Sequence, residues 1–132
     1  MKAETDLSVL LKNLNPMASS ENYVFTTLPA DKLSSTLVSV AKGMFQEREG
    51  TTLILPVTAA KQANLQFEGY YRCITCEVHS SLDAVGMTAA MSTALSKAGI
   101  SANVVAAYYH DHIFVPAEKV DVALDVLTSL SN

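Results

Sequence analysis

The chain is 132 residues long, with 49% hydrophobic and 17% charged residues and a formal net charge of −4 at pH 7. This length suits one ordinary domain or two very small units that share a core, and the composition excludes a disordered chain. The negative charge and the lack of a cluster of basic and aromatic residues exclude nucleic acid as a partner, and the lack of a long apolar run excludes a membrane-spanning helix.

The first half of the chain predicts two helices and three strands from its hydrophobic spacing. The helices cover residues 6–14 and 57–64, and the strands cover residues 23–28, 44–48 and 52–55. Leucines at helical spacing define the first helix, and Pro16 lies just beyond its end. Glu49 and Gly50 indicate a tight turn between the last two strands, whereas residues 31–42 show no clear pattern.

The second half predicts the order strand, helix, strand, strand, helix (βαββα). The strands cover residues 70–78, 103–108 and 113–115, and the helices cover residues 81–98 and 120–130. Ser80 or Ser81 caps the longer helix, Asp83 takes the place of the usual glutamate of a capping box, and Gly99 ends the helix. We expect residues 109–112 to form the turn of the hairpin.

Cys73 and Cys76 have the spacing of a redox or metal-binding CxxC motif, but they lie in the predicted strand 70–78. Positions three apart in a strand point to opposite faces, so the two thiols do not share a metal or form a disulfide. No helix begins after Cys73, as a redox motif requires. We therefore predict two buried free thiols.

A strand hairpin followed by a helix occurs twice, in residues 44–64 and in residues 103–130, which suggests a degenerate duplication. We therefore predict an α+β fold of two tandem units, residues 1–70 and 71–132, that share an antiparallel sheet. No strand follows the last helix, so we expect residues 22–72 to complete the sheet of the second unit.

Right-handed connections place the ends of several predicted elements at one edge of the second unit. His79 and the turn 109–112 meet there with the N-terminus of helix 81–98, whose free N–H groups favour an anion such as a carboxylate. Gly86, one turn into this helix, costs about 1 kcal/mol relative to alanine, which suggests that something approaches the backbone closely. Packing of the helix against the sheet is the alternative explanation of this glycine.

These segments resemble the ACT-domain family. Residues 79–103 are similar to the ACT pattern of a turn with a glycine, a helix and an Ala-Gly-Ile step into a second strand. Residues 104–116 resemble the hairpin of small stand-alone ACT proteins, and residues 23–29 and 45–56 are similar to their N-terminal ACT-like module. The resemblance implies a ferredoxin-like fold with two tandem ACT-like units, the first of them degenerate.

The resemblance also implies that an amino acid binds at the strand–helix turn, beside a neighbouring unit or across a dimer. The implied ligand-binding residues are His79, Ser80, Ser81, Leu82, Asp83, Val85, Gly86, Met87, Asn103, Tyr109, His110, Asp111 and His112. Backbone N–H groups of Val85 to Met87 meet the ligand carboxylate, and Asp111 meets its ammonium group. The Pro-Gly that is usual in this turn is Val85-Gly86 here.

The same residues allow a metal site and a catalytic site as alternatives. His110 and His112 are two apart and have the spacing to hold a divalent metal with His79, Asp111 and Glu77, although His and Asp residues in hairpins are more often solvated turn residues. The sequence contains no nucleophile elbow, phosphate loop or metalloprotease spacing. We therefore predict that the protein is not an enzyme and holds no metal or cofactor.

We predict a regulatory or sensor protein that binds a small molecule, specifically an amino acid, and forms a homodimer. We expect a cytoplasmic location, because Lys2 and Glu4 interrupt the apolar segment that a signal peptide requires. The alternative function is a ligand-free oligomerisation or protein-interaction module, which would use the polar sheet face that includes Thr75 and Glu77.

Overall fold

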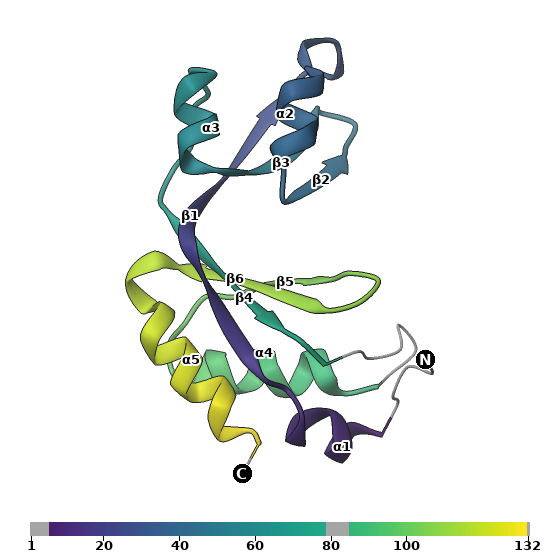
Figure 1. Cartoon of the computed structure of the whole chain (residues 1–132), viewed down its shortest axis with the longest axis vertical. Coiled ribbons are helices and arrows are strands. Elements are labelled where there is room, and N and C mark those ends of the chain that lie inside the picture. Colours follow the sequence, from purple (N-terminus) through teal and green to yellow (C-terminus); the bar gives the residue numbers. More distant parts are fainter. Residues whose placement is uncertain (1–5, 79–84, 132) are drawn as a thin grey trace. The chain divides into compact units, whose positions relative to one another are not determined.

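The computed structural model describes residues 6–78 and 85–131, and it has the predicted α+β fold (Figure 1). The helices are α1 (Leu7–Lys12), α2 (Ser35–Val40), α3 (Val57–Gln62), α4 (Met87–Lys97) and α5 (Val120–Ser129). The strands are β1 (Pro16–Leu28), β2 (Gly43–Gln46), β3 (Thr51–Pro56), β4 (Tyr71–Cys76), β5 (Asn103–Ala106) and β6 (Asp111–Pro116). Short 3-10 turns cover Ala30–Lys32 and Ala117–Lys119.

The strands are hydrogen-bonded in the order β2-β3-β1-β4-β6-β5. The chain packs as two compact units, one of residues 21–71 and one that combines the chain up to Ser20 with the chain from Arg72 onward. We call them the 21–71 unit and the 72–132 unit. The sequence-based division at residue 70 stays a prediction, since contacts within the structure group the leading helix and the start of β1 with the second half of the chain.

β1 supplies the strand that the 72–132 unit lacks. Its residue Ser19 accepts a hydrogen bond from the backbone N–H of Cys73 at 3.1 Å, and its carbonyl accepts one from Arg72 Nε at 2.7 Å. The prediction that the first half of the chain completes this sheet is therefore confirmed. The expected range was wrong, because the residue that bonds to β4 is Ser19, which lies before residues 22–72.

The core of the 72–132 unit forms where α1, α4 and α5 cover one face of its strands. Met87, Met91 and Leu95 recur at i, i+4 and i+8 on α4 and are all buried, which is the spacing of a helix with one apolar face. Inward-facing residues of β4 and β6, among them Ile74 and Ile113, complete this core. A packed layer of helices therefore supports β4 and β6 from one side.

The 21–71 unit has a smaller core of its own. Val24, Leu37, Leu53, Leu55 and Ala60 are its buried members. Strand alternation places the neighbours of these residues on the opposite face of β1 and β3, because successive side chains of a strand point to opposite sides. That second face carries the groove described below.

The two hairpins, β2–β3 and β5–β6, have the same register. Gly43 pairs with Ile54 in the first, and Asn103 pairs with Phe114 in the second, so each residue lies 60 positions after its counterpart. Each four-residue connection is closed by a backbone hydrogen bond, of 2.9 Å from Glu47 to Gly50 and of 3.1 Å from Ala107 to His110. The predicted structural repeat is confirmed in these hairpins.

Several predicted boundaries were wrong. The turn expected at residues 109–112 lies at residues 107–110, because Asp111 and His112 pair with β5 at the start of β6. The first hairpin likewise turns over residues 47–50, and not only at Glu49 and Gly50. Residues 31–42 contain α2, whose start is capped by Ser34 Oγ as it accepts a 3.1 Å hydrogen bond from Leu37 N–H.

None of the helices in the described ranges is long and apolar enough to cross a membrane.

A cavity mutation tests whether α1 belongs to the core of the 72–132 unit. Leu10 is fully buried in that core, so Leu10→Ala should lower the free energy of unfolding by about 2–5 kcal/mol in urea denaturation. Its neighbour Val9 is 41% exposed, and Val9→Ala should change the free energy by less than about 0.5 kcal/mol. Equal effects of the two substitutions would show that α1 does not pack as described.

Candidate functional site

The candidate site lies where the end of β4 meets the start of β6. Thr75 Oγ1 and His112 Nδ1 are hydrogen-bonded at 2.9 Å and join the two strands on one face of the sheet. On the other face Cys76 Sγ lies 3.8 Å from Met91 Sδ, which joins β4 to the second turn of α4. β4 is therefore joined to β6 on one face and to the second turn of α4 on the other. The prediction that the hairpin and the beginning of α4 form one site stays a prediction.

The predicted helix 81–98 is not continuous, since Val85 and Gly86 are not helical and α4 begins at Met87, whereas residues 81–84 lie outside the described residues. Gly86 is its N-cap residue and has φ of +95°, a left-handed conformation that only glycine adopts without strain. A Cβ atom at this position would lie 3.1 Å from Leu7 Cδ2 of α1. Backbone conformation and helix packing together therefore explain this glycine, which is close to the packing alternative raised from the sequence.

The first N–H groups of a helix such as α4 have no intrahelical acceptor. The N-cap residue Gly86 has no side chain to cap them, and no side chain among the described residues is recorded as doing so. The first intrahelical bond runs from Ala90 N–H to the carbonyl of Gly86 at 2.8 Å. Val85, directly before this turn, is 82% exposed. That the backbone of Val85 to Met87 binds a carboxylate stays a prediction.

Asp111 occupies the first position of β6 and is buried, with 6% of its surface exposed. Burial raises the pKa of its carboxyl group above the usual value of 3.8, and the nearby His110 opposes this shift. Asp111 also contributes to the raised pKa of Cys76, which places the carboxyl near the end of β4. A buried carboxylate gains from the approach of a cation, because its charge has lost part of its hydration.

The two described histidines differ in their surroundings. His112 is bonded to Thr75, whereas His110 lies in the connection between β5 and β6, and its Nδ1 atom is buried without a hydrogen-bond partner among the described residues. Within residues 6–78 and 85–131, no group of three or more histidine, cysteine or acidic side chains is arranged to hold a metal ion.

The remaining predicted residues are dispersed. Tyr109 is 63% exposed and packs edge-to-face on Tyr108, with ring centroids 4.9 Å apart. Asn103 pairs with Phe114, so it lies about 10 Å along the hairpin from Asp111 at the usual rise per residue. His79, Ser80, Ser81, Leu82 and Asp83 lie outside the described residues.

The prediction for the cysteines is confirmed. Both thiols are free and buried, and they lie on opposite faces of β4. Cys76 contacts Met91 on the helix side, whereas Cys73 lies 3.9 Å from the Thr75 hydroxyl on the other side. Burial raises the pKa of the Cys76 thiol to about 12, and Asp111 and Cys73 add to the shift.

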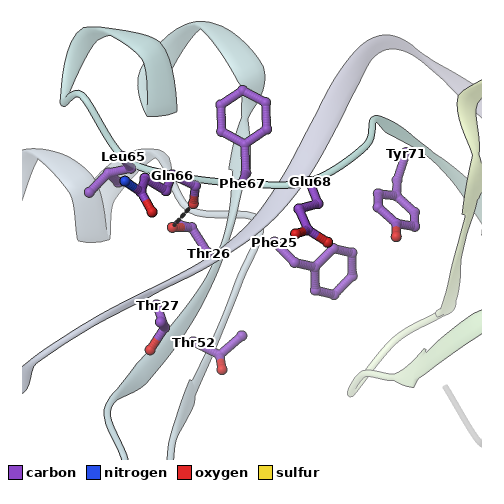
Figure 2. A pocket seen from close by; sticks show the side chains of 9 residues that line it. All are labelled: Phe25, Thr26, Thr27, Thr52, Leu65, Gln66, Phe67, Glu68 and Tyr71. Carbon is purple, nitrogen blue, oxygen red and sulfur yellow. Dashed lines mark hydrogen bonds between the residues drawn. The ribbon is translucent and has the colours of Figure 1, made fainter.

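Sequence reasoning missed a groove of about 970 Å³ within the 21–71 unit. Its lining residues are Phe25, Thr26, Thr27, Thr52, Leu65, Gln66, Phe67, Glu68 and Tyr71. Figure 2 shows Phe25, Glu68 and Tyr71 gathered at one end of it, with Thr27 and Thr52 at the other. The clustering of Phe67, Tyr70 and Tyr71 near Glu68 was the signal in the sequence that could have found it.

Comparisons with known proteins agree with this fold. Sequence models of the family described as ACT domain match the chain over residues 2–72 and again over residues 68–129. No protein of curated function matches.

Three solved structures illustrate the similarity. A Vibrio cholerae protein of unknown function, titled a possible transport protein, is 42% identical over 96% of both chains, with a TM-score of 0.84. An Agrobacterium tumefaciens protein is 18% identical over 84% of both chains, with a TM-score of 0.67. The regulatory subunit of aspartate kinase from Thermus thermophilus is 9% identical, covers 89% of this chain and 97% of its own, and has a TM-score of 0.65.

The thiols provide a test of the strand geometry. Neither Cys73 nor Cys76 should react with an aromatic disulfide reagent at pH 8 in the native protein, because both are buried and the Cys76 thiol stays protonated. Both should react in 6 M guanidinium chloride, as absorbance of the released thiolate will show. Rapid reaction of the native protein at both positions would contradict the burial described.

The Asp111 carboxyl makes the stability of the ligand-free protein depend on pH. Its folded pKa lies above the unfolded value, so the free energy of unfolding falls as the pH rises from below 3.8 through the folded pKa. Asp111→Asn removes this loss, and the variant should be more stable than the wild type at pH 7 but not at pH 3. Urea denaturation at both pH values measures the difference in unfolding free energy between the variant and the wild type. The same difference at pH 3 and pH 7 would contradict the effect of burial on the Asp111 carboxyl.

Proposed function

This chain belongs to the ACT-domain family, and we propose that it is a regulatory protein that binds an amino acid in its 72–132 unit. The observation that carries the proposal is a buried carboxyl, Asp111, in the same unit as the start of α4. A regulatory role is supported by the structural similarity to a regulatory subunit of aspartate kinase.

The two groups complement the two charges of an amino acid. Backbone N–H groups of Val85 to Met87 would bind the α-carboxylate, because a helix N-terminus carries unpaired donors and a positive partial charge. Asp111 would pair with the ammonium group. The approach of this cation lowers the pKa of Asp111, so affinity should rise with pH through the range in which the free carboxyl titrates.

The proposed mode of action is regulation of a partner and not catalysis. The proposed binding groups are backbone N–H donors and one buried carboxyl, which complement the two charges of a ligand. The contact of the Thr75 hydroxyl with His112 Nδ1 at 2.9 Å is assigned the structural role of joining β4 to β6. The proposal includes a homodimer in the cytoplasm, in which a neighbouring subunit covers the ligand. A buried amino acid would then stabilise the dimer as well as the fold.

A ligand-free oligomerisation module remains the second candidate. It is favoured by the large hydrophobic side chains exposed on or beside the terminal strands of the sheet, Phe45 (70%) at β2 and Tyr108 (72%) beside β5. Edge strands with exposed apolar side chains commonly pair with another chain. Under this function, substitution of Phe45 or Tyr108 would alter self-association, whereas Asp111→Asn would not.

Thermal-shift screening against the proteinogenic amino acids tests the main proposal. At about 100 times its dissociation constant a ligand adds about 2.7 kcal/mol to stability, which raises the melting temperature by several degrees. We expect at least one amino acid to do so. If protein refolded from denaturant, and so freed of any copurified ligand, responds to none of them, the amino-acid function is wrong.

A pair of matched variants tests whether the amino acid binds at Asp111. Asp111→Asn should abolish the ligand-induced shift while leaving the ligand-free protein at least as stable as the wild type, so loss of binding is not confused with loss of folding. Asp125→Asn removes an exposed carboxyl from α5 of the same unit and should keep the full shift. An unchanged shift in Asp111→Asn would place the ligand elsewhere.

A further inference from the structure

We infer that the groove of the 21–71 unit is a binding site for a small organic amine, that is, a primary ammonium group on a short apolar chain without a carboxylate. The groove volume of about 970 Å³ lies within the usual range of small-molecule sites. It lies outside the 72–132 unit, so this inference is independent of the amino-acid site and either one can fail alone.

The groove is built between a sheet face and a tethered segment. Phe25, Thr27 and Thr52 are on the face of β1 and β3 opposite to the core, and residues 65–71 form the other wall. Thr26 Oγ1 donates a 2.8 Å hydrogen bond to the carbonyl of Gln66, which lies 40 positions later in the chain (Figure 2). Leu65 N–H is bonded to the carbonyl of Ala60 at 3.0 Å. These hydrogen bonds fix the position of residues 65 and 66 beside β1 and α3.

Aromatic rings supply the surface on which a cation binds. Phe25 and Tyr71 meet edge-to-face, with centroids 5.2 Å apart and planes at 71°, and both are half-buried. Both residues line the groove. The face of an aromatic ring attracts a cation through its quadrupole, and the ring also packs against an attached methylene chain.

The charge at the groove is negative. Glu68 is the only charged residue of the lining, and among the described residues its carboxylate makes no hydrogen bond or ion pair. A second carboxylate, of Glu47, accepts a hydrogen bond from the Thr52 hydroxyl at the other end. Glu68 and the aromatic residues Phe25 and Tyr71 line the same groove, so charge and aromatic surface are offered together (Figure 2).

The aromatic rings and the carboxylates together favour an amine over an amino acid. An ammonium group gains from Glu68 and from the rings, whereas a carboxylate would meet acidic groups at both ends and no basic side chain in the lining. A free amino acid is therefore disfavoured here, in contrast to the Asp111 site, where backbone donors are available. The alkyl part of an amine would contact Leu65, Phe67 and the aromatic pair.

Titration with four-carbon probes, followed by amide shifts in ¹H–¹⁵N NMR spectra, tests the inference. We expect butylammonium to shift the amides of Thr27, Gln66 and Glu68 in a saturable manner. Butanol should bind at least about fivefold more weakly, since it lacks the charge that interacts with the carboxylate. Butyrate and 4-aminobutyrate should cause no saturable shift. Equal binding of butylammonium and butanol, or saturable binding of 4-aminobutyrate, would overturn the inference.

Variants separate the carboxylate from the aromatic surface. Glu68→Gln keeps the size of this exposed side chain and should weaken butylammonium binding about fivefold. Phe25→Leu should weaken it by a similar factor through loss of the ring, with retained dispersion of the spectrum showing that the fold persists. Glu49→Gln, an equally conservative change outside the groove, should have no effect. Wild-type affinity in both groove variants would show that the amine binds elsewhere.

Discussion

The 13-residue strand β1 is the constraint on which the rest of the structure depends. Its residues 23–28 pair with β3, and Ser19 is hydrogen-bonded to Arg72 and Cys73 at the start of β4. Backbone N–H and C=O groups in a fold must find partners. Among the described residues from Arg72 to Ser131, the chain supplies β4, β5 and β6 but no strand after α5. β1 fills that place, and α1, directly before it, is thereby brought over the core.

The elements that sequence predicted well are those whose signal is local. β3 and β6 each contain three consecutive apolar residues followed by a proline, and α5 repeats its apolar residues at helical spacing, so no distant contact is needed to recognise them. The start of β1 was missed because Ser19, Ser20 and Glu21 are polar, and their strand conformation depends on β4. The start of α4 was missed because the left-handed conformation of Gly86, next to Leu7 of α1, is a tertiary feature.

The sequence named candidate residues of the site, but it did not predict how the structure arranges them. The sequence identified Asp111 and the turn at Gly86, and topology placed them at one end of the unit. It put Asp111 in a solvated turn, however, since polar runs such as His110 to His112 resemble turns when the pairing of β5 with β6 is unknown. The groove of the 21–71 unit was missed because its walls come from β1 and from a segment about 40 residues later, so the aromatic residues near Glu68 were the one local signal of it.

The shared register of the two hairpins bears on how many ligands one chain can hold. Thr51 begins β3 as Asp111 begins β6, and it is equally buried, with 3% of its surface exposed. A threonine hydroxyl carries no charge, so the 21–71 unit has no carboxylate with which to pair an ammonium group at the corresponding position. The repeat therefore preserved the backbone and not the chemistry, and the stoichiometry of amino-acid binding should be one molecule per chain.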